Sequence, residues 1–270
     1  MKKIIAIVLL AVLGLMCFVS CGGTQTDKEY IQAKGKLVVG ITEYPPMDYK
    51  ETPDGEWIGF DADMARLAAE ELGVEVEFVV IDWKKKTAEL QSKNIDLIWN
   101  GMTATDELDE GMDFSVSYAE NKQVVVTKAE NSSLYTTIES LKNAKIAVED
   151  GSAGDITATN SVGATTINRV GNQATALLEV QAGTSQVAII DQTMAAGLVG
   201  EGDYSDLVMI DPEVISFSRE IFAVGCRTGS DMVAFLNEVF KKYYDNGKMA
   251  ELVEEYGSVV LNDTALEALD

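Results

Sequence analysis

The strongest constraint on the fold is a strand–turn–helix pattern that occurs twice along the chain. Apolar, strand-like segments at residues 36–41 and 145–148 are each followed by a loop and then by a helical pattern. Strands and helices that alternate at this spacing are typical of α/β folds. Extended connectors at 124–127 and 215–218 separate the two units. The pattern predicts two α/β lobes with a cleft between them, where ligands favour the carboxyl ends of strands.

The periodicity of the remaining chain predicts further helices and strands. An apolar helical face ends at Gly73, which we expect to close that helix. Ser230 is expected to cap a late amphipathic helix, which Asn246 and Gly247 interrupt. The other predicted segments are strands at 74–80, 95–99 and 187–190, and helices at 84–92, from about 155, at 174–181 and at 249–256. Residues after Gly257 are acidic and are expected to form a peripheral tail.

The chain begins with a short basic end and an apolar run over residues 4–19. This pattern is typical of a secretory signal peptide rather than of a transmembrane helix. Residues 18–21 resemble a bacterial lipobox, in which Cys21 is lipidated and becomes the mature N-terminus. Plain cleavage before that point, or an uncleaved anchor, is the alternative. The predicted segments are a signal peptide at 1–20 and a lipid-anchored tether at 21–33.

The composition excludes several classes of function. The chain has no histidine, so it can form neither a Ser-His-Asp triad nor a Cys-His dyad. Its formal charge of −23 disfavours a nucleic-acid partner. Cys226 would be the only thiol of the folded part, and its apolar neighbours indicate a buried strand residue rather than a nucleophile. No metal site, cofactor or disulfide is expected.

Several segments, in order along the chain, resemble the family 3 bacterial extracellular solute-binding proteins, which are the amino-acid receptors of ABC importers. Residues 35–47 are similar to the opening strand and loop of the family, and residues 55–65 to its segment containing Gly-Phe-Asp. Residues 94–105 are similar to its segment around Gly-Met-Thr. The remaining similar segments are 113–118, 151–154 and Asp191.

The resemblance implies a type II periplasmic-binding-protein fold, in which two α/β lobes are joined by two hinge strands. Lobe 1 would be built from both ends of the folded chain, with lobe 2 inserted between them. The corresponding limits are 34–122 for the first part of lobe 1, 123–212 for lobe 2, 213–258 for the second part of lobe 1, and 259–270 for a C-terminal tail. A monomer is expected.

An amino-acid zwitterion needs donors for its carboxylate, acceptors for its ammonium group and a wall for its side chain. The turn at 151–154 could present the backbone N–H groups of Ser152 and Ala153 to an anion, or it could simply start a helix. Asp191 follows an apolar strand, and a carboxylate buried there needs a cation, a capping role or solvent. The resemblance implies that Asp191 accepts hydrogen bonds from the ligand ammonium.

Lobe 1 would complete the site. The resemblance implies that Thr103, beside Asn100 and Gly101, contacts the ligand carboxylate and ammonium; the alternative for Thr103 is a cap at the strand end. Tyr44 and Trp83 lie where the family encloses its ligand between aromatic rings. Packing within lobe 1 is the alternative for both rings.

One departure from the family pattern leaves the ligand open. Where the family has an arginine that pairs with the ligand carboxylate, this chain has Leu108. Another cation, backbone donors alone, or a ligand that is not a standard α-amino acid could account for this. Arg219 is the candidate substitute, with a surface or hinge salt bridge as the alternative. Glu43 could face the ligand side chain or solvent, and Trp99 is expected in the core.

These observations favour a lipid-anchored, extracytoplasmic receptor that captures a polar amino acid or a similar solute by hinge closure and delivers it to an ABC permease. An enzyme on the same fold, such as a dehydratase, is one alternative, in which Glu43 and Asp191 could meet across the cleft as an acid/base pair. The absence of histidine weighs against that alternative. An extracytoplasmic sensor domain is the other, although we expect no signalling segment after residue 257.

Overall fold

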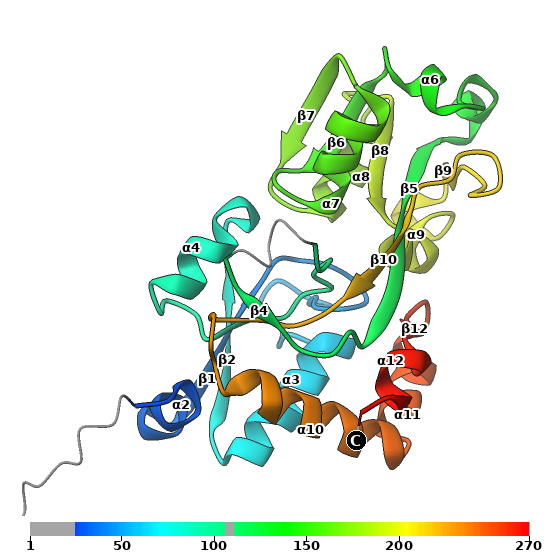
Figure 1. Ribbon diagram of the computed structural model, residues 1–270. Helices are drawn as coiled ribbons and strands as arrows, with labels where there is room; N and C mark the ends of the chain where they lie inside the picture. Colours follow the sequence, from blue (N-terminus) through cyan, green and yellow to red (C-terminus); the bar gives the residue numbers. More distant parts are fainter. Residues whose placement is uncertain (1–24, 106–110, 270) are drawn as a thin grey trace, which may run out of the picture.

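The computed structural model describes residues 25–105 and 111–269, which form two α/β lobes around two β-sheets (Figure 1). The predicted signal peptide, Cys21 and Leu108 lie outside the described residues. Over the two described ranges, no helix is both long enough and apolar enough to cross a membrane.

The first sheet has the strand order β2-β1-β3-β11-β4. β1 (Lys36–Ile41) pairs in parallel with β2 (Glu75–Val80) on one side and with β3 (Leu97–Ile98) on the other. β11 (Gly225–Cys226) pairs antiparallel with β3, and β4 (Asp113–Phe114) pairs antiparallel with β11 at the edge of the sheet. β1 is buried from its second residue onward, as its unbroken apolar sequence predicts for a strand covered on both faces.

The helices of lobe 1 come from both ends of the described chain. Their bounds are α2 (Asp27–Lys34), α3 (Phe60–Leu72), the 3₁₀ turn η1 (Trp83–Lys85), α4 (Lys86–Gln91), α10 (Met232–Asp245) and α11 (Lys248–Tyr256). α3 ends as predicted at Gly73, whose N–H donates to the carbonyl groups of Ala69 and Glu70. Ser230 lies one residue before the N-cap of α10, and its hydroxyl accepts a hydrogen bond from the Met232 N–H.

Two terminal segments differ from the sequence prediction. Residues 27–33, predicted as part of a tether, lie in α2, because Thr26 and Glu29 make a reciprocal capping box and Ile31 is buried. The tail is not peripheral either. It forms β12 (Val260–Leu261), which pairs with the long strand β5, and α12 (Asp263–Glu267), which buries Leu266.

The second sheet has the order β10-β5-β8-β6-β7, and β9 and β12 also pair with β5. Its parallel core is β6 (Lys145–Glu149), flanked by β7 (Thr166–Val170) and β8 (Val187–Asp191). The other segments of this part are β9 (Leu207–Met209), η2 (Ala129–Leu134), α6 (Ile138–Leu141), α7 (Ala153–Ile156), the π-helical η3 (Thr157–Val162), α8 (Gln173–Gln181), α9 (Gln192–Leu198) and η4 (Gly202–Tyr204). Because β6 and β8 are parallel, Glu149 and Asp191 end at the same edge of the sheet.

Two neighbouring antiparallel strands connect the lobes (Figure 1). They are β5 (Ala119–Lys128) and β10 (Arg219–Phe222). The connectors predicted at 124–127 and 215–218 are therefore shifted. Residues 123–127 pair with β8 inside the second sheet, and 119–122 pair with β10.

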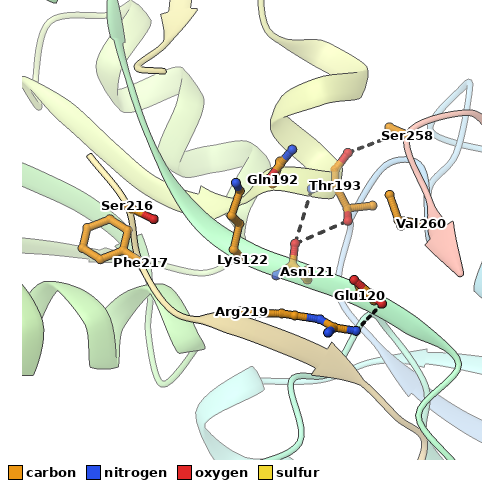
Figure 2. A pocket seen from close by; sticks show the side chains of 10 residues that line it. All are labelled: Glu120, Asn121, Lys122, Gln192, Thr193, Ser216, Phe217, Arg219, Ser258 and Val260. Carbon is orange, nitrogen blue, oxygen red and sulfur yellow. Dashed lines mark hydrogen bonds and ion pairs between the residues drawn. The ribbon is translucent and has the colours of Figure 1, made fainter. Parts of the chain in front are cut away.

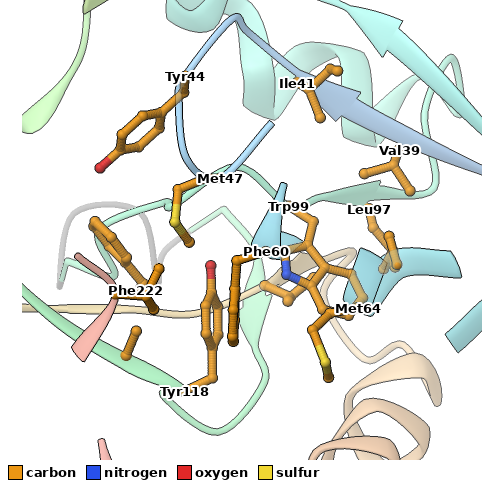
Figure 3. Packing of buried hydrophobic residues seen from close by; sticks show 14 of the residues in the cluster. Val39, Ile41, Tyr44, Met47, Phe60, Met64, Leu97, Trp99, Tyr118 and Phe222 are labelled. Atoms are coloured by element: carbon orange, nitrogen blue, oxygen red, sulfur yellow. The ribbon is translucent and has the colours of Figure 1, made fainter. Parts of the chain in front are cut away.

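Aromatic rings pack against one another in the core of lobe 1 (Figure 3). Tyr118 stacks on Phe240 at a centroid distance of 5.2 Å, and Trp99 lies tilted against the same ring at 5.5 Å. Trp99 is fully buried, as predicted for a core residue. Cys226 is buried as well, and its burial raises the pKa of the thiol far above the usual range, so the prediction of a core residue is confirmed.

Candidate functional site

A small cavity lies between the lobes and is lined by side chains from both of them. The space in it that a water-sized sphere can reach is about 20 Å³, far below the range of roughly 300–1,000 Å³ that holds drug-sized ligands, so the cavity must widen to admit a ligand. The lining residues are Tyr44, Trp83, Asn100, Gly101, Thr103, Glu149, Ser152, Ala153, Gln173 and Asp191. The structure therefore brings together every residue predicted for ligand binding except Glu43 and Arg219, and it adds Glu149 and Gln173.

Asp191 is the most extensively hydrogen-bonded carboxylate of the cavity. It ends β8 and is 4% exposed. Its carboxylate accepts hydrogen bonds from the side-chain amides of Asn121 at 2.5 Å, Gln123 at 2.6 Å and Gln173. Burial raises the pKa of Asp191, while the hydrogen bonds from Gln173 and Gln123 oppose that rise because they favour the ionised form. The amides also fix the direction in which the carboxylate faces.

Two further carboxylates lie close to Asp191. Glu149 ends β6 and is 3% exposed, and its burial, together with the charge of Asp191, raises its pKa to about 8. Glu220, on β10, accepts hydrogen bonds from the Thr103 hydroxyl at 3.1 Å and from the Gln123 amide at 2.9 Å. Burial raises the pKa of Glu220 to about 7. Within the described ranges, no group of three or more acidic or cysteine side chains is placed to hold a metal ion.

The walls of the cavity in lobe 1 are aromatic. Tyr44 and Trp83 are both buried and both line the cavity. Gly101 has a φ of +52°, and a Cβ atom there would lie 2.5 Å from the Tyr44 ring. Only glycine therefore combines this backbone conformation with so close an approach to the ring. Burial and the neighbouring Asp191 carboxylate raise the pKa of Tyr44, which keeps its hydroxyl protonated.

A buried polar network supports this wall from behind. The side chain of Asn100 accepts hydrogen bonds from the N–H and the hydroxyl of Thr42 and donates to Asp48 at 2.8 Å. Asp61 accepts from the Gly101 N–H at 2.6 Å, and burial raises its pKa to about 7. Asn100 therefore uses its side chain to hold the loop, which leaves its backbone as the part that can contact a ligand.

The predicted turn at 151–154 begins a helix. The Ser152 hydroxyl accepts a hydrogen bond from the Asp155 N–H at 3.2 Å, which makes Ser152 the N-cap of α7. Ala153 is the first residue of that helix, where backbone N–H groups have no partner within the helix. Ser152 is therefore a helix cap, and both residues still border the cavity.

Arg219 and Glu43 lie elsewhere. Arg219 lines a different pocket beside the hinge strands, where its side chain is 61% exposed and forms an ion pair with Glu120 (Figure 2). This position favours the salt-bridge alternative. A role toward a ligand carboxylate stays a prediction, which calorimetry on Arg219→Ala tests. Glu43 is exposed next to Tyr44 and does not line the cavity.

The two lobes touch on either side of the cavity. Lys84 of η1 forms an ion pair with Asp150 at 3.2 Å, and the Lys86 ammonium donates to the Gly151 carbonyl at 3.1 Å. On the hinge side, the Ser258 hydroxyl donates to the Thr193 carbonyl at 2.9 Å (Figure 2). These contacts close the cleft around the cavity.

Comparison with known proteins identifies one protein family. Residues 37–259 match the model of the bacterial extracellular solute-binding proteins, family 3. The L-cystine-binding protein TcyJ of Escherichia coli K12 is 26% identical over 255 residues, which cover 94% of this chain and 92% of TcyJ.

Solved structures agree with the fold. A substrate-binding protein of an ABC uptake transporter from Streptococcus pneumoniae, with bound histidine, has a TM-score of 0.79 and 30% identity, covering 88% of this chain and 98% of its own. An ancestral amino-acid-binding protein, AncCDT-1, described as a precursor of cyclohexadienyl dehydratase, has a TM-score of 0.76 and 29% identity, covering 85% of this chain and 98% of its own. The predicted type II fold is confirmed.

Proposed function

The chain belongs to family 3 of the bacterial extracellular solute-binding proteins, and from this premise we propose that it captures a polar amino acid or a similar small solute for an ABC importer. The observation that carries this proposal is the cavity between the lobes. It combines a buried carboxylate, Asp191, with the aromatic side chains of Tyr44 and Trp83, contributed from opposite lobes. This is the chemistry that an ammonium group and an aliphatic stem require.

Each lobe has a role in the proposed complex. Asp191 accepts hydrogen bonds from the ligand ammonium, because its three amide partners hold the carboxylate in place. Tyr44 and Trp83 enclose the ligand stem. The Ala153 N–H provides a donor for the ligand carboxylate, and the Thr103 hydroxyl provides a second one when it turns away from Glu220; both are weaker than a bidentate arginine.

Binding is coupled to closure of the cleft. A ligand that touches both lobes stabilises the closed arrangement, in which Lys84 meets Asp150 and Lys86 meets Gly151. The permease of an importer would then recognise the closed protein. The lobe limits at 34–122, 123–212 and 213–258, and a monomeric state, belong to this proposal.

We also propose where the protein resides and that it binds its ligand without converting it. We place the protein outside the cytoplasm, anchored through a lipid on Cys21 after removal of the signal peptide. We propose binding without turnover, although AncCDT-1 is described as the precursor of a dehydratase. Incubation with prephenate-like acids tests this point, because product formation would contradict it.

A thermal-shift screen of the mature chain against the standard amino acids and related solutes tests the main proposal. A ligand present at about 100 times its Kd stabilises the folded state by about 2.7 kcal/mol, so Tm rises with ligand concentration. At least one amino acid is expected to produce this shift. If a solute without an amino group shifts Tm while every amino acid leaves it unchanged, the proposed ligand class is wrong.

A further inference from the structure

The cavity contains a buried carboxylate whose hydrogen bonding is incomplete. Glu149 is 3% exposed, and its Oε1 atom has no hydrogen-bond partner among the described residues. A buried polar atom without a partner costs free energy, more so when it is charged. Because Glu149 lines the same cavity as Asp191, a ligand in that cavity can provide the missing partner.

The charges around Glu149 leave the cavity acidic. Asp191 at the end of β8 repels it, and Lys86 of α4 attracts it, while the Thr42 side chain after β1 favours its ionised form. Lys86 donates to the Gly151 and Trp83 carbonyl groups, and its ammonium lies 4.9 Å from the centre of the Trp83 ring. None of the ten lining residues is a lysine or arginine.

A third carboxyl group adds to this acidic cluster. Glu220 shares the amides of Asn121 and Gln123 with Asp191, and the two carboxylates repel each other. A zwitterion with an uncharged side chain brings a single cation, its ammonium group, which Asp191 binds, and so leaves Glu149 without a cationic partner. A ligand with a second cationic group provides that partner and favours the ionised form of Glu149 in a site of low dielectric.

We propose that the cavity selects a basic amino acid, with the α-ammonium group at Asp191 and the side-chain cation at Glu149. This inference rests on the proposed function and names its substrate class. Trp83 and Tyr44 add to the selection because aromatic faces attract cations. Glu149 is then a specificity-determining residue of the site.

If a cationic ligand binds at Glu149, its binding should be coupled to the release of a proton. Burial raises the pKa of Glu149 to about 8 in the empty cavity, so the group is largely protonated at neutral pH. A cationic ligand requires the ionised form, and its binding therefore releases a proton. Affinity for the basic ligand should increase as pH rises from about 6 and should level off above about 8.

The test is isothermal titration calorimetry with two pairs of probes, L-arginine against L-citrulline and L-lysine against L-norleucine. Each pair differs in the charge of the side chain. The wild-type chain should bind at least one basic member at least about 30-fold more tightly than its uncharged partner. Titration at about pH 7 in two buffers of different ionisation enthalpy should show proton release.

Glu149→Gln is the decisive variant. It should lose the preference for the basic ligand and the proton release, while Glu139→Gln, an exposed acidic position on α6, should keep both. Thermal melts establish that Glu149→Gln folds. If Glu149→Gln binds the basic ligand as wild type does, or if the uncharged partners bind equally well, the inference is overturned. Tight binding of a neutral amino acid alone would overturn it and leave the proposed function intact, whereas no binding of any amino acid would remove both.

Discussion

Gln173 holds Asp191 through both ends of its side-chain amide. Its Nε2 donates to the Asp191 carboxylate, and its Oε1 accepts a hydrogen bond from the Asp191 backbone N–H at 2.9 Å. Gln173 is the first residue of α8, so a helix start and a strand end are joined at the cavity. This pair fixes the group that we assign to the ligand ammonium.

Gln173→Ala should therefore weaken both the fold and the site. Removal of the amide leaves part of a buried carboxylate without a donor, which costs about 1–3 kcal/mol of unfolding free energy. The pKa of Asp191 should rise further, so ligand affinity at neutral pH should fall. Urea denaturation and calorimetry measure the two effects. Gln181→Ala, a change at the partly exposed last residue of the same helix, should alter stability by less than about 0.5 kcal/mol; equal losses in both variants would contradict the assigned role.

Gly101→Ala should disturb Tyr44. The new Cβ would lie 2.5 Å from the ring, in addition to the strain of a positive φ. We expect a loss of about 2–4 kcal/mol, with strain and overpacking both contributing, and weaker ligand binding.

Gly163→Ala is the matched control for this clash, because φ is +65° there and no atom lies within 4 Å of the new Cβ. Gly163→Ala should lose only the strain contribution, about 1–2 kcal/mol of unfolding free energy, and should bind the ligand as wild type does. Denaturation curves measure the stability of both variants, and calorimetry measures their ligand affinity. A Gly101→Ala protein that matches Gly163→Ala in stability and affinity would show that the close approach to Tyr44 is unimportant.

Lys84→Ala should loosen the closed arrangement. The ion pair with Asp150 spans the cleft and is partly exposed, so it contributes about 0.2–1 kcal/mol. Ligand affinity should fall about two- to fivefold at low salt, and the difference should shrink as salt screens the pair. Lys85→Ala removes a pair with Asp82 within the same segment of lobe 1 and should leave affinity unchanged. Equal ligand affinities in the two variants would contradict a role for the Lys84–Asp150 pair in closing the cleft.

Stability should depend on pH through the buried carboxyl groups. Burial raises the pKa of Glu149 to about 8 and those of Asp61 and Glu220 to about 7. At neutral pH the folded state therefore keeps protons that the unfolded chain has released. The contribution of these groups to the free energy of unfolding is complete below about pH 4 and is lost as pH rises through 7 to 8.

Between its pKa in the unfolded chain and its higher pKa in the folded state, each such group lowers the free energy of unfolding by about 1.4 kcal/mol per pH unit. Tm of the unliganded chain, measured from about pH 5 to pH 9, should fall more gently in Glu149→Gln than in wild type. An unchanged slope would mean that Glu149 is not protonated in the empty cavity.

Much of the site could be predicted from the ends of strands. Asp191 and the turn at Ser152 follow apolar segments that become parallel strands, and parallel strands bring their carboxyl ends to one edge. The close approach of Tyr44 to Gly101 fits the predicted aromatic wall. These features depend on local sequence and on simple sheet geometry.

Side-chain direction within a strand was harder to predict. Successive residues of a strand point to opposite faces, and Arg219 lies on the outer face of β10, while the next residue, Glu220, reaches Thr103. Glu149 and Gln173 were missed for a related reason. Glu149 ends strand β6 and Gln173 starts helix α8. The sequence of a strand end or of a helix start does not show whether the side chain there enters the cavity.

The central claim is that the Asp191 carboxylate binds the ammonium group of an amino acid between the lobes. Calorimetric titration of wild type and Asp191→Asn with the amino acid found in the screen tests it most directly, with Asp203→Asn at an exposed position as the control. We predict at least about 30-fold weaker binding in folded Asp191→Asn and wild-type affinity in the control. Equal affinity in wild type and Asp191→Asn would contradict the claim.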